Sequence, residues 1–429
     1  MSSFNFDSDS VLGLTHELCG IQSYWEREKV GEDGSYNGVH EGNFARRVRD
    51  LLSECSWLTV TMEEVEAGRY NVIAADCPLG DIEMLFTAHL DTATPSDGWN
   101  ELLGSICEDK YYNLGAIDTK GAIASIIDAC KKVGQTKGVG YLFYVDEEYD
   151  FKGMDHFIQN HPDVRPKIAL SGCGGQARML VECRGCIEIY MQVRGKSGHA
   201  SRPREGLNAA LALMQAYSAM EALCNSANAL SPPIVTSINL GGFYAGQKVK
   251  DGTKDSAAEV APVANKIPDL AWMVVDVRPG HVAITGDALS QVAYYAIDRF
   301  NSDLENADYN GTIEGDGNGD VFRRIRCLRD PAEATVWVRH YRGCYVSDPE
   351  AVQVIRDAFN HMIESEDVNP GQFGYIDVAE IANLRGASLV CLGPNGGNQH
   401  SRDEWVSIPS LIAYRDGCAR LLNNFKPKA

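Results

Sequence analysis

The chain has 429 residues, of which 44% are hydrophobic and 23% are charged, as in ordinary globular proteins. This length is sufficient for two domains that each bury a sizeable core. The 59 acidic residues outnumber the 39 basic ones and give a formal charge of −20. Nucleic acids and anionic membranes select basic surfaces, so neither is expected as a partner.

The N-terminal residues 1–9 are acidic and contain no continuous apolar core of the kind found in secretory signal peptides. No apolar run in the sequence is long enough to span a bilayer. We therefore expect a cytoplasmic protein. We also expect its 13 cysteines to be reduced, because cytosolic thiols rarely form disulfides.

The first part of the chain alternates predicted strands and helices. Apolar runs at 84–88 and 139–145 indicate buried strands, and a helix begins between them near Gly121. Strand–helix–strand order with short links is typical of an α/β domain with a largely parallel central sheet flanked by helices. The other elements predicted for this domain are helices at 41–55 and from Pro349 onward, and strands at 70–75, 166–170 and 387–392.

Polar side chains follow the two buried strands. His89 and Asp91 follow the first, and in an extended chain two residues apart they point to the same side. Glu147 and Glu148 follow the second, and Asp118 lies just before the helix between the strands. In open α/β sheets, ligands bind beyond the carboxyl ends of the strands. Adjacent carboxylates repel each other unless a cation lies nearby, so a metal site is one interpretation and a solvated acidic turn is the other.

The pattern changes after residue 184. The segment 187–194 alternates apolar and polar residues, which is typical of a half-exposed antiparallel strand. The elements predicted after it are strands at 234–240, 270–277 and 335–340, helices at 207–214 and 289–300, and a loop at 306–320. This order predicts a ferredoxin-like α+β domain at 185–342, inserted into an α/β domain of residues 1–184 and 343–429.

Four candidate metal ligands lie in the α/β domain. His89, Asp118, Glu148 and His400 are two imidazoles and two carboxylates, which borderline-soft divalent metals such as zinc prefer. A carboxylate can bridge two metals, and two metals about 3.5–4 Å apart would clamp a water and polarise a carbonyl. Glu147, next to a ligand but free of metal itself, is then the candidate general base.

The chain resembles a known superfamily of metallopeptidases in four motifs that follow the superfamily's order. The motifs are Ala88-His89-Leu90-Asp91-Thr92, Gly115-Ala116-Ile117-Asp118-Thr119-Lys120-Gly121, Asp146-Glu147-Glu148, and His400 with Arg402-Asp403-Glu404. They are similar to those of the zinc aminoacylases, acetylornithine deacetylases, succinyl-diaminopimelate desuccinylases and carboxypeptidase G.

This resemblance implies a catalytic role for Glu147 as general base and for Asp91 as the residue that orients His89. It also implies that Asp118 bridges two Zn2+ ions per subunit, for which Co2+ or Mn2+ could substitute. His89 would bind the first ion, whereas Glu148 and His400 would complete the shell of the second.

One position departs from the superfamily's pattern. Cys173 occupies the place where the superfamily usually has Glu or Asp. A thiolate is a competent zinc ligand, so the first metal would be held by His89, Asp118 and Cys173. The alternative is that Cys173 is a small apolar packing residue, which would leave this metal site weak or empty.

The inserted domain carries a further resemblance to the superfamily's lid and dimerisation domain. The matching segments are Gly195-Lys196-Ser197-Gly198-His199-Ala200, Asn265-Lys266-Ile267-Pro268-Asp269 and Asp276-Val277-Arg278. The resemblance implies a homodimer in which His199 reaches the partner subunit's active site, while Asn265 and Arg278 hold the substrate carboxylate. A planar guanidinium suits a carboxylate. Without the resemblance, His199 would be interpreted as a structural histidine and Arg278 as a surface ion pair.

We therefore expect a zinc-dependent hydrolase that cleaves an amide bond adjacent to a free carboxylate. Its substrate would be a small acylated amino acid or a peptide, as in an N-acyl-amino-acid deacylase or a carboxypeptidase. The alternative is a degenerate relative that keeps the fold as a binding or scaffold protein, with Cys173 as its sign. Retention of Glu147 beside the other ligand-type residues favours the enzyme.

Overall fold

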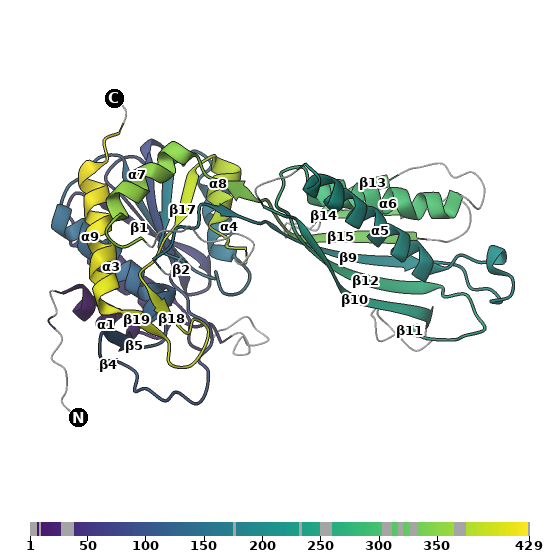
Figure 1. Cartoon of the computed structure of the whole chain (residues 1–429), viewed down its shortest axis with the longest axis horizontal. Helices are drawn as coiled ribbons and strands as arrows, with labels where there is room; N and C mark the ends of the chain where they lie inside the picture. Colours follow the sequence, from purple (N-terminus) through teal and green to yellow (C-terminus); the bar gives the residue numbers. More distant parts are fainter. Residues whose placement is uncertain are drawn as a thin grey trace. The chain divides into compact units, whose positions relative to one another are not determined.

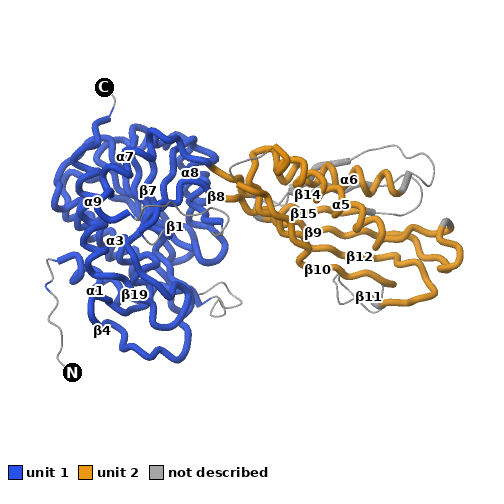
Figure 2. The backbone as a smooth tube through the Cα atoms, in the orientation of Figure 1, with its two compact units in different colours: residues 1–182, 346–429 blue, residues 183–345 orange. Residues whose placement is uncertain are grey.

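The computed structural model describes residues 7, 10–26, 38–174, 177–230, 234–248, 260–302, 311–315, 321–326, 333–363 and 375–427 (Figure 1). The chain forms two compact units (Figure 2), one of residues 1–182 and 346–429 and the other of residues 183–345. The sequence pattern had placed the limits of the insert at 185 and 342.

The first unit is built on a six-stranded sheet in the order β1-β2-β6-β3-β7-β17. Four neighbouring strands are parallel, as the sequence predicted: β6 (Val139–Tyr144), β3 (Met84–His89), β7 (Ile168–Ser171) and β17 (Ser388–Cys391). β1 (Thr59–Glu66) and β2 (Arg69–Ala75) add an antiparallel edge. β3 and β6 are buried along their whole length, which explains their continuous apolar sequences.

Helices enclose this sheet. One apolar core joins the sheet to α1 (Val11–Cys19), α2 (Gly42–Ser53), α3 (Gly121–Val133), α7 (Pro349–Phe359) and α9 (Ile408–Asn424). The shorter helices α4 (Lys152–Asn160) and α8 (Ala379–Arg385) pack against each other and against strands of the same sheet.

A small sheet in the first unit joins distant parts of the chain. Its order is β18-β19-β5-β4, with β18 (Gly396–Gly397), β19 (Trp405–Ser407), β5 (Lys110–Tyr112) and β4 (Ser105–Cys107). The pairing of β19 with β5 places the segment that follows His400 beside the segment that precedes Asp118. Where the units meet in the sequence, β8 (Glu182–Cys183) pairs with β16 (Tyr345–Val346).

The second unit is an antiparallel sheet with α5 (Ala209–Asn228) and α6 (Gly286–Ser302). The strand order is β11 (Val260–Ala261), β10 (Ser237–Lys248), β12 (Leu270–Arg278), β9 (Cys186–Arg194), β15 (Glu333–Arg342), β14 (Val321–Arg326) and β13 (Gly311–Gly315). Alternate residues of β9 are buried in a core that includes both helices, so the predicted α+β insert is confirmed.

One sequence prediction for this unit is wrong in part. The segment 306–320 was expected to be a loop, but it contains β13, which pairs in register with β14. Its Gly-, Asp- and Asn-rich composition favours turns, yet backbone pairing with a neighbouring strand overrides that local preference. The rest of that segment lies outside the described residues. Within the described part of the chain, no helix has both the length and the apolar character that a membrane crossing requires.

Candidate active site

Parallel strands bring the candidate residues to one edge of the six-stranded sheet. His89, the last residue of β3, pairs with Tyr144, the last residue of β6. Glu147 follows β6 in the chain, and Cys173 follows β7, the other neighbour of β3. The carboxyl ends of the three adjacent strands therefore deliver an imidazole, a carboxylate and a thiol to the same place, as expected for an open α/β sheet.

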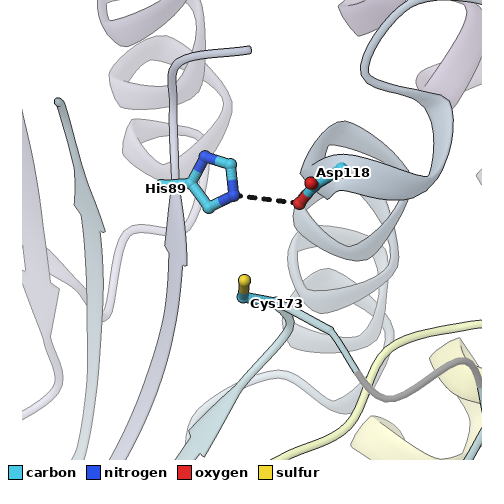
Figure 3. Close-up of side chains that lie close together, drawn as sticks. All are labelled: His89, Asp118 and Cys173. Carbon is cyan, nitrogen blue, oxygen red and sulfur yellow. Dashed lines mark hydrogen bonds and ion pairs between the residues drawn. The ribbon is translucent and has the colours of Figure 1, made fainter. Parts of the chain in front are cut away.

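The first group of ligand-type side chains is His89, Asp118 and Cys173. The Nε2 atom of His89 lies 3.0 Å from Oδ1 of Asp118 (Figure 3). The sulfur of Cys173 points toward both of them, and one ligand atom from each residue lies within 4.8 Å of the others. All three residues are buried. The structure thus brings together the three residues proposed for the first metal.

The second group shares Asp118 with the first. Its Oδ2 atom lies 3.1 Å from Nε2 of His400, and the same nitrogen lies 3.1 Å from Oε1 of Glu148. Ligand atoms of Asp118, Glu148 and His400 also lie within 4.8 Å of one another. Each oxygen of the Asp118 carboxylate therefore faces a different imidazole, which is the arrangement that a carboxylate bridging two cations requires.

Asp91 contacts His89, although not in the way that strand geometry predicted. β3 ends at His89, so Asp91 lies in the turn beyond the strand and not on the same strand face. From there, its carbonyl oxygen lies 3.1 Å and its Oδ1 atom 3.4 Å from Nδ1 of His89. Its Oδ2 atom accepts a hydrogen bond from the backbone N–H of Glu148 at 2.9 Å. Asp91 thus contacts both an imidazole and the acidic segment after β6.

Glu147 lies beside these groups. Ligand-type atoms of His89, Glu147 and Glu148 lie within 4.8 Å of one another. The enclosure of its carboxyl group raises the pKa of Glu147 well above its usual value, although the nearby His89 opposes this shift. A carboxylate with a raised pKa is a stronger base, which suits proton transfer near neutral pH.

The two imidazoles hold protons firmly when no metal competes for them. Hydrogen bonds to Asp118 and Glu148 raise the pKa of His400 to about 10. Burial would lower the pKa of His89, but its contacts with Asp118 and Asp91 outweigh burial and raise that pKa. Burial would likewise raise the pKa of Asp118, but hydrogen bonds from the two imidazoles hold it below its usual value.

Glu404 supports Asp118 from the motif that contains His400. Its Oε1 atom accepts hydrogen bonds from the N–H groups of Ile117 and Asp118, at 3.0 and 3.1 Å, and its Oε2 atom accepts one from Gly115 at 2.9 Å. Gly115 has φ +76°, and a Cβ there would approach Thr92 to 2.7 Å, so the turn requires glycine. The sequence showed Glu404 within a motif, but its partners depend on the pairing of β19 with β5.

The three candidate substrate-binding residues all lie in the second unit, where the structure separates them into two places. His199 and Asn265 are exposed and adjacent, since the carbonyl of Asn265 accepts the N–H of Ala200 at 3.0 Å. Arg278 ends β12, a strand of nine residues that spans about 26 Å, and Asn265 lies beyond the strand's other end. Nε of Arg278 lies 3.0 Å from Oδ2 of Asp276. Within one chain, Asn265 and Arg278 therefore do not meet.

Comparisons with known proteins identify relatives of this chain. An acetylornithine deacetylase of Aliivibrio salmonicida is 33% identical over 294 residues, which are 63% of this chain and 74% of that protein. An acetylornithine deacetylase of Aliivibrio fischeri is 33% identical over 177 residues, 39% of this chain and 46% of that protein, so the match spans about half of its length.

Solved structures share the fold over nearly the whole chain. The aminopeptidase PepT of Bacillus cereus has a TM-score of 0.65 at 16% identity, covering 97% of this chain and 98% of that one. The protein YXEP of Bacillus subtilis, described as a dinuclear metal binding peptidase, has a TM-score of 0.58 at 14% identity with coverage of 97% and 98%. The model of Peptidase family M20/M25/M40 matches residues 85–424. Since that match covers most of the sequence, the chain belongs to peptidase family M20/M25/M40.

Proposed function

We propose that the protein is a metal-dependent hydrolase that cleaves an amide bond adjacent to a free carboxylate, with Glu147 as general base. The observation that supports this most directly is the position of Asp118, whose two oxygens each face a different imidazole. Glu147 lies at the same sheet edge, within reach of His89.

The residues at this edge fit two divalent cations. His89, Asp118 and Cys173 would hold one, and Asp118, Glu148 and His400 would hold the other. A set of imidazole, carboxylate and thiolate ligands suits zinc best, with Co2+ or Mn2+ as substitutes. When bound, the two cations would polarise the substrate carbonyl and lower the pKa of a water molecule.

The side chains then have separate tasks. Glu147 accepts a proton from the attacking water on a carboxylate oxygen and later donates it to the leaving amine. Asp91 holds the His89 ring through Nδ1, which leaves Nε2 free to act as a ligand. Glu404 fixes the backbone at Asp118 and so fixes the direction of the bridging carboxylate.

The substrate is a small N-acyl amino acid or peptide. Relatives named acetylornithine deacetylase support the first class, and structural neighbours named as peptidases support the second. The second unit acts as a lid and dimerisation domain in a homodimer, with His199 and Asn265 of one subunit and Arg278 of the other at each site. Their separation within one chain supports this division between subunits.

The rival proposal is a binding or scaffold protein that has lost catalysis. A protein of that kind need not keep Glu147 and the ligand-type residues close together. Yet within each of the three groups, the ligand-type atoms lie within 4.8 Å of one another. The geometry therefore favours the enzyme.

The test is turnover of a panel of N-acyl amino acids and dipeptides by zinc-loaded protein, with Glu147→Gln as the key variant. We expect Glu147→Gln to reduce kcat about 100- to 10,000-fold while metal content stays unchanged. Glu63→Gln is a matched control. Glu63 lies on β1, the edge strand of the sheet, where it pairs with His161 away from the proposed metal ligands. Wild-type protein that binds no metal and cleaves no member of the panel would favour the scaffold, and a Glu147→Gln variant of normal rate would remove Glu147 as the base.

A further inference from the structure

The segment that carries Glu147 and Glu148 needs support from outside itself. We call residues 146–151 the acidic loop; it connects β6 to α4. Asp146 and Phe151 have positive φ angles of 73° and 63°, which residues other than glycine rarely adopt. Such a backbone persists only where surrounding contacts hold it.

Asp146 closes the acidic loop on itself. Its Oδ2 atom accepts hydrogen bonds from the N–H groups of Asp150 at 3.3 Å and Lys152 at 3.2 Å. Its backbone carbonyl accepts one from Phe151 at 2.8 Å. Asp146 is completely buried, so its carboxylate also needs a cation. The direction of that carboxylate determines the path of the loop.

Arg69 is that cation. β2 pairs antiparallel with β6, and continuing the register beyond Val72 and Phe143 brings Arg69 opposite Asp146. Nη2 of Arg69 lies 2.6 Å from Oδ1 of Asp146. The Arg69 side chain is 3% exposed, and its guanidinium carbon lies 4.3 Å from the ring centroid of Trp25.

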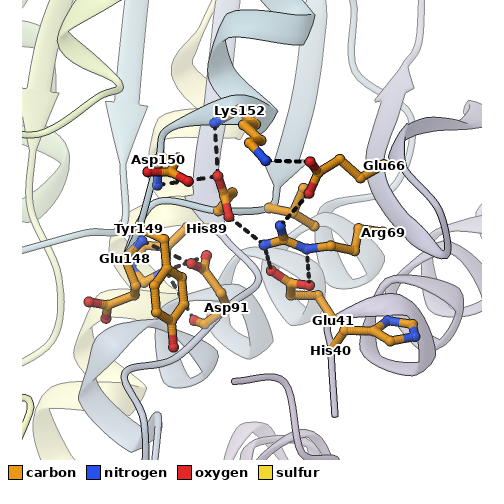
Figure 4. Close-up of polar contacts among 12 residues, drawn as sticks. His40, Glu41, Glu66, Arg69, His89, Asp91, Glu148, Tyr149, Asp150 and Lys152 are labelled. Carbon is orange, nitrogen blue, oxygen red and sulfur yellow. Dashed lines mark hydrogen bonds and ion pairs between the residues drawn. The ribbon is translucent and has the colours of Figure 1, made fainter. Parts of the chain in front are cut away.

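The other donors of Arg69 are also used. Nε donates to Glu41 at 2.8 Å and Nη1 donates to Glu66 at 2.9 Å (Figure 4). Glu41 and Asp146 are both fully buried, so two carboxylates share one guanidinium. Only the planar fork of arginine can address three carboxylates in fixed directions, because a lysine ammonium is a single point charge.

We propose that Arg69 is a positioning residue for Glu147 and Glu148, acting through Asp146. The contacts run from Arg69 to the Asp146 carboxylate and from there to the backbone of the acidic loop. Asp91, in the turn after β3, holds the same loop from the other side of β6 by accepting the Glu148 N–H. This inference rests on the function proposed above for Glu147 and Glu148, but its structural part concerns the loop alone.

The test is Arg69→Lys, which keeps the positive charge and removes the fork. Hydrogen exchange of the metal-free protein reports on the loop directly: we expect faster exchange at the N–H groups of Asp150 and Lys152. In the zinc-loaded enzyme, assayed at a temperature well below its unfolding midpoint, we expect kcat to fall about 10- to 100-fold with little change in KM. Asp146→Asn should reproduce both effects, and the double variant should be no worse than the more severe single one.

Arg415→Lys is the matched control. Nη1 of Arg415 lies 2.7 Å from an oxygen of Asp128, so this variant also weakens an arginine–aspartate pair in the first unit, between α9 and α3. We expect it to change the unfolding midpoint and leave both the loop exchange and kcat unchanged. If Arg69→Lys does not fold, the same measurements are made on Asp146→Asn alone.

Two results would overturn the inference. The first is unchanged exchange in the acidic loop of Arg69→Lys and Asp146→Asn. The second is normal kcat in both variants of an active enzyme. If wild-type protein cleaves no substrate at all, the proposed function fails, and the exchange experiment still decides whether Arg69 holds the loop.

Discussion

Replacing Cys173 with serine tests whether a thiolate completes the first metal site. Serine has nearly the same shape, but its hydroxyl is neutral at ordinary pH and is a poor zinc ligand. Burial raises the pKa of the Cys173 thiol in the absence of metal, although the nearby His89 opposes this shift. A bound zinc ion would remove that proton outright.

The expected size of the effect follows from the number of ligands. Cys173 is one of three side chains in the first group, with His89 and Asp118, whose ligand atoms lie within 4.8 Å of one another. Structural zinc sites with four protein ligands bind with about 10–16 kcal/mol, or about 2.5–4 kcal/mol per ligand if shared equally. Loss of one ligand should therefore weaken the first site about 100- to 1,000-fold and leave the second site largely intact.

The assay is metal stoichiometry after equal dialysis against a competing chelator. Cys173→Ser should retain fewer zinc ions than wild type, whereas Cys173→Asp should recover binding and accept harder metals such as manganese. Cys418→Ser is the matched control, since Cys418 is a buried cysteine of α9 outside the three ligand groups. Equal zinc content and equal activity in wild type and Cys173→Ser would show that Cys173 only packs, and that another ligand holds the first metal.

Other predictions concern the dimer, the acidic loop and the imidazoles. Mixing Glu147→Gln subunits with His199→Ala subunits should restore partial activity, because one site of each hybrid regains both groups; no recovery despite verified subunit exchange would remove the role of His199 across the dimer. Asn71→Leu should destabilise the first unit by about 1–3 kcal/mol in chemical denaturation, because the N–H of Val145, next to the acidic loop, would lose the Asn71 side-chain oxygen that accepts its hydrogen bond. Zinc binding at pH 8 should release protons, since the pKa of His400 is raised to about 10 and that of His89 is also raised, so zinc affinity should fall as the pH falls. Binding heats that do not depend on the buffer's ionisation enthalpy would contradict that last expectation.

The sequence was most informative where the residues of a single strand indicate its position without reference to distant segments. The apolar runs of β3 and β6 predicted buried parallel strands, and the polar residues after them predicted a site at their carboxyl ends. That prediction needed only the direction of the strands, because parallel neighbours end at the same edge.

What the sequence did not show depends on pairing between distant segments. Arg69 meets Asp146 across 77 positions through the register of β2 with β6. Glu404 reaches Ile117 across 287 positions through the small sheet. Neither charge is unusual in its local sequence, so only the fold reveals their partners. β13 was missed for the same reason, since its pairing with β14 overrides a turn-rich composition.

The insertion of the second unit also determines the order in which the protein can assemble during synthesis. β17 pairs with β7 across the inserted residues 183–345, so the large sheet lacks its last strand until the ribosome has passed residue 391. His400 and α9 emerge later still, whereas the second unit is contiguous and can fold from its own contacts. The first unit therefore remains an incomplete sheet with an unpaired β7 edge, and the Asp118 carboxylate gains its contact with His400 only near the end of translation.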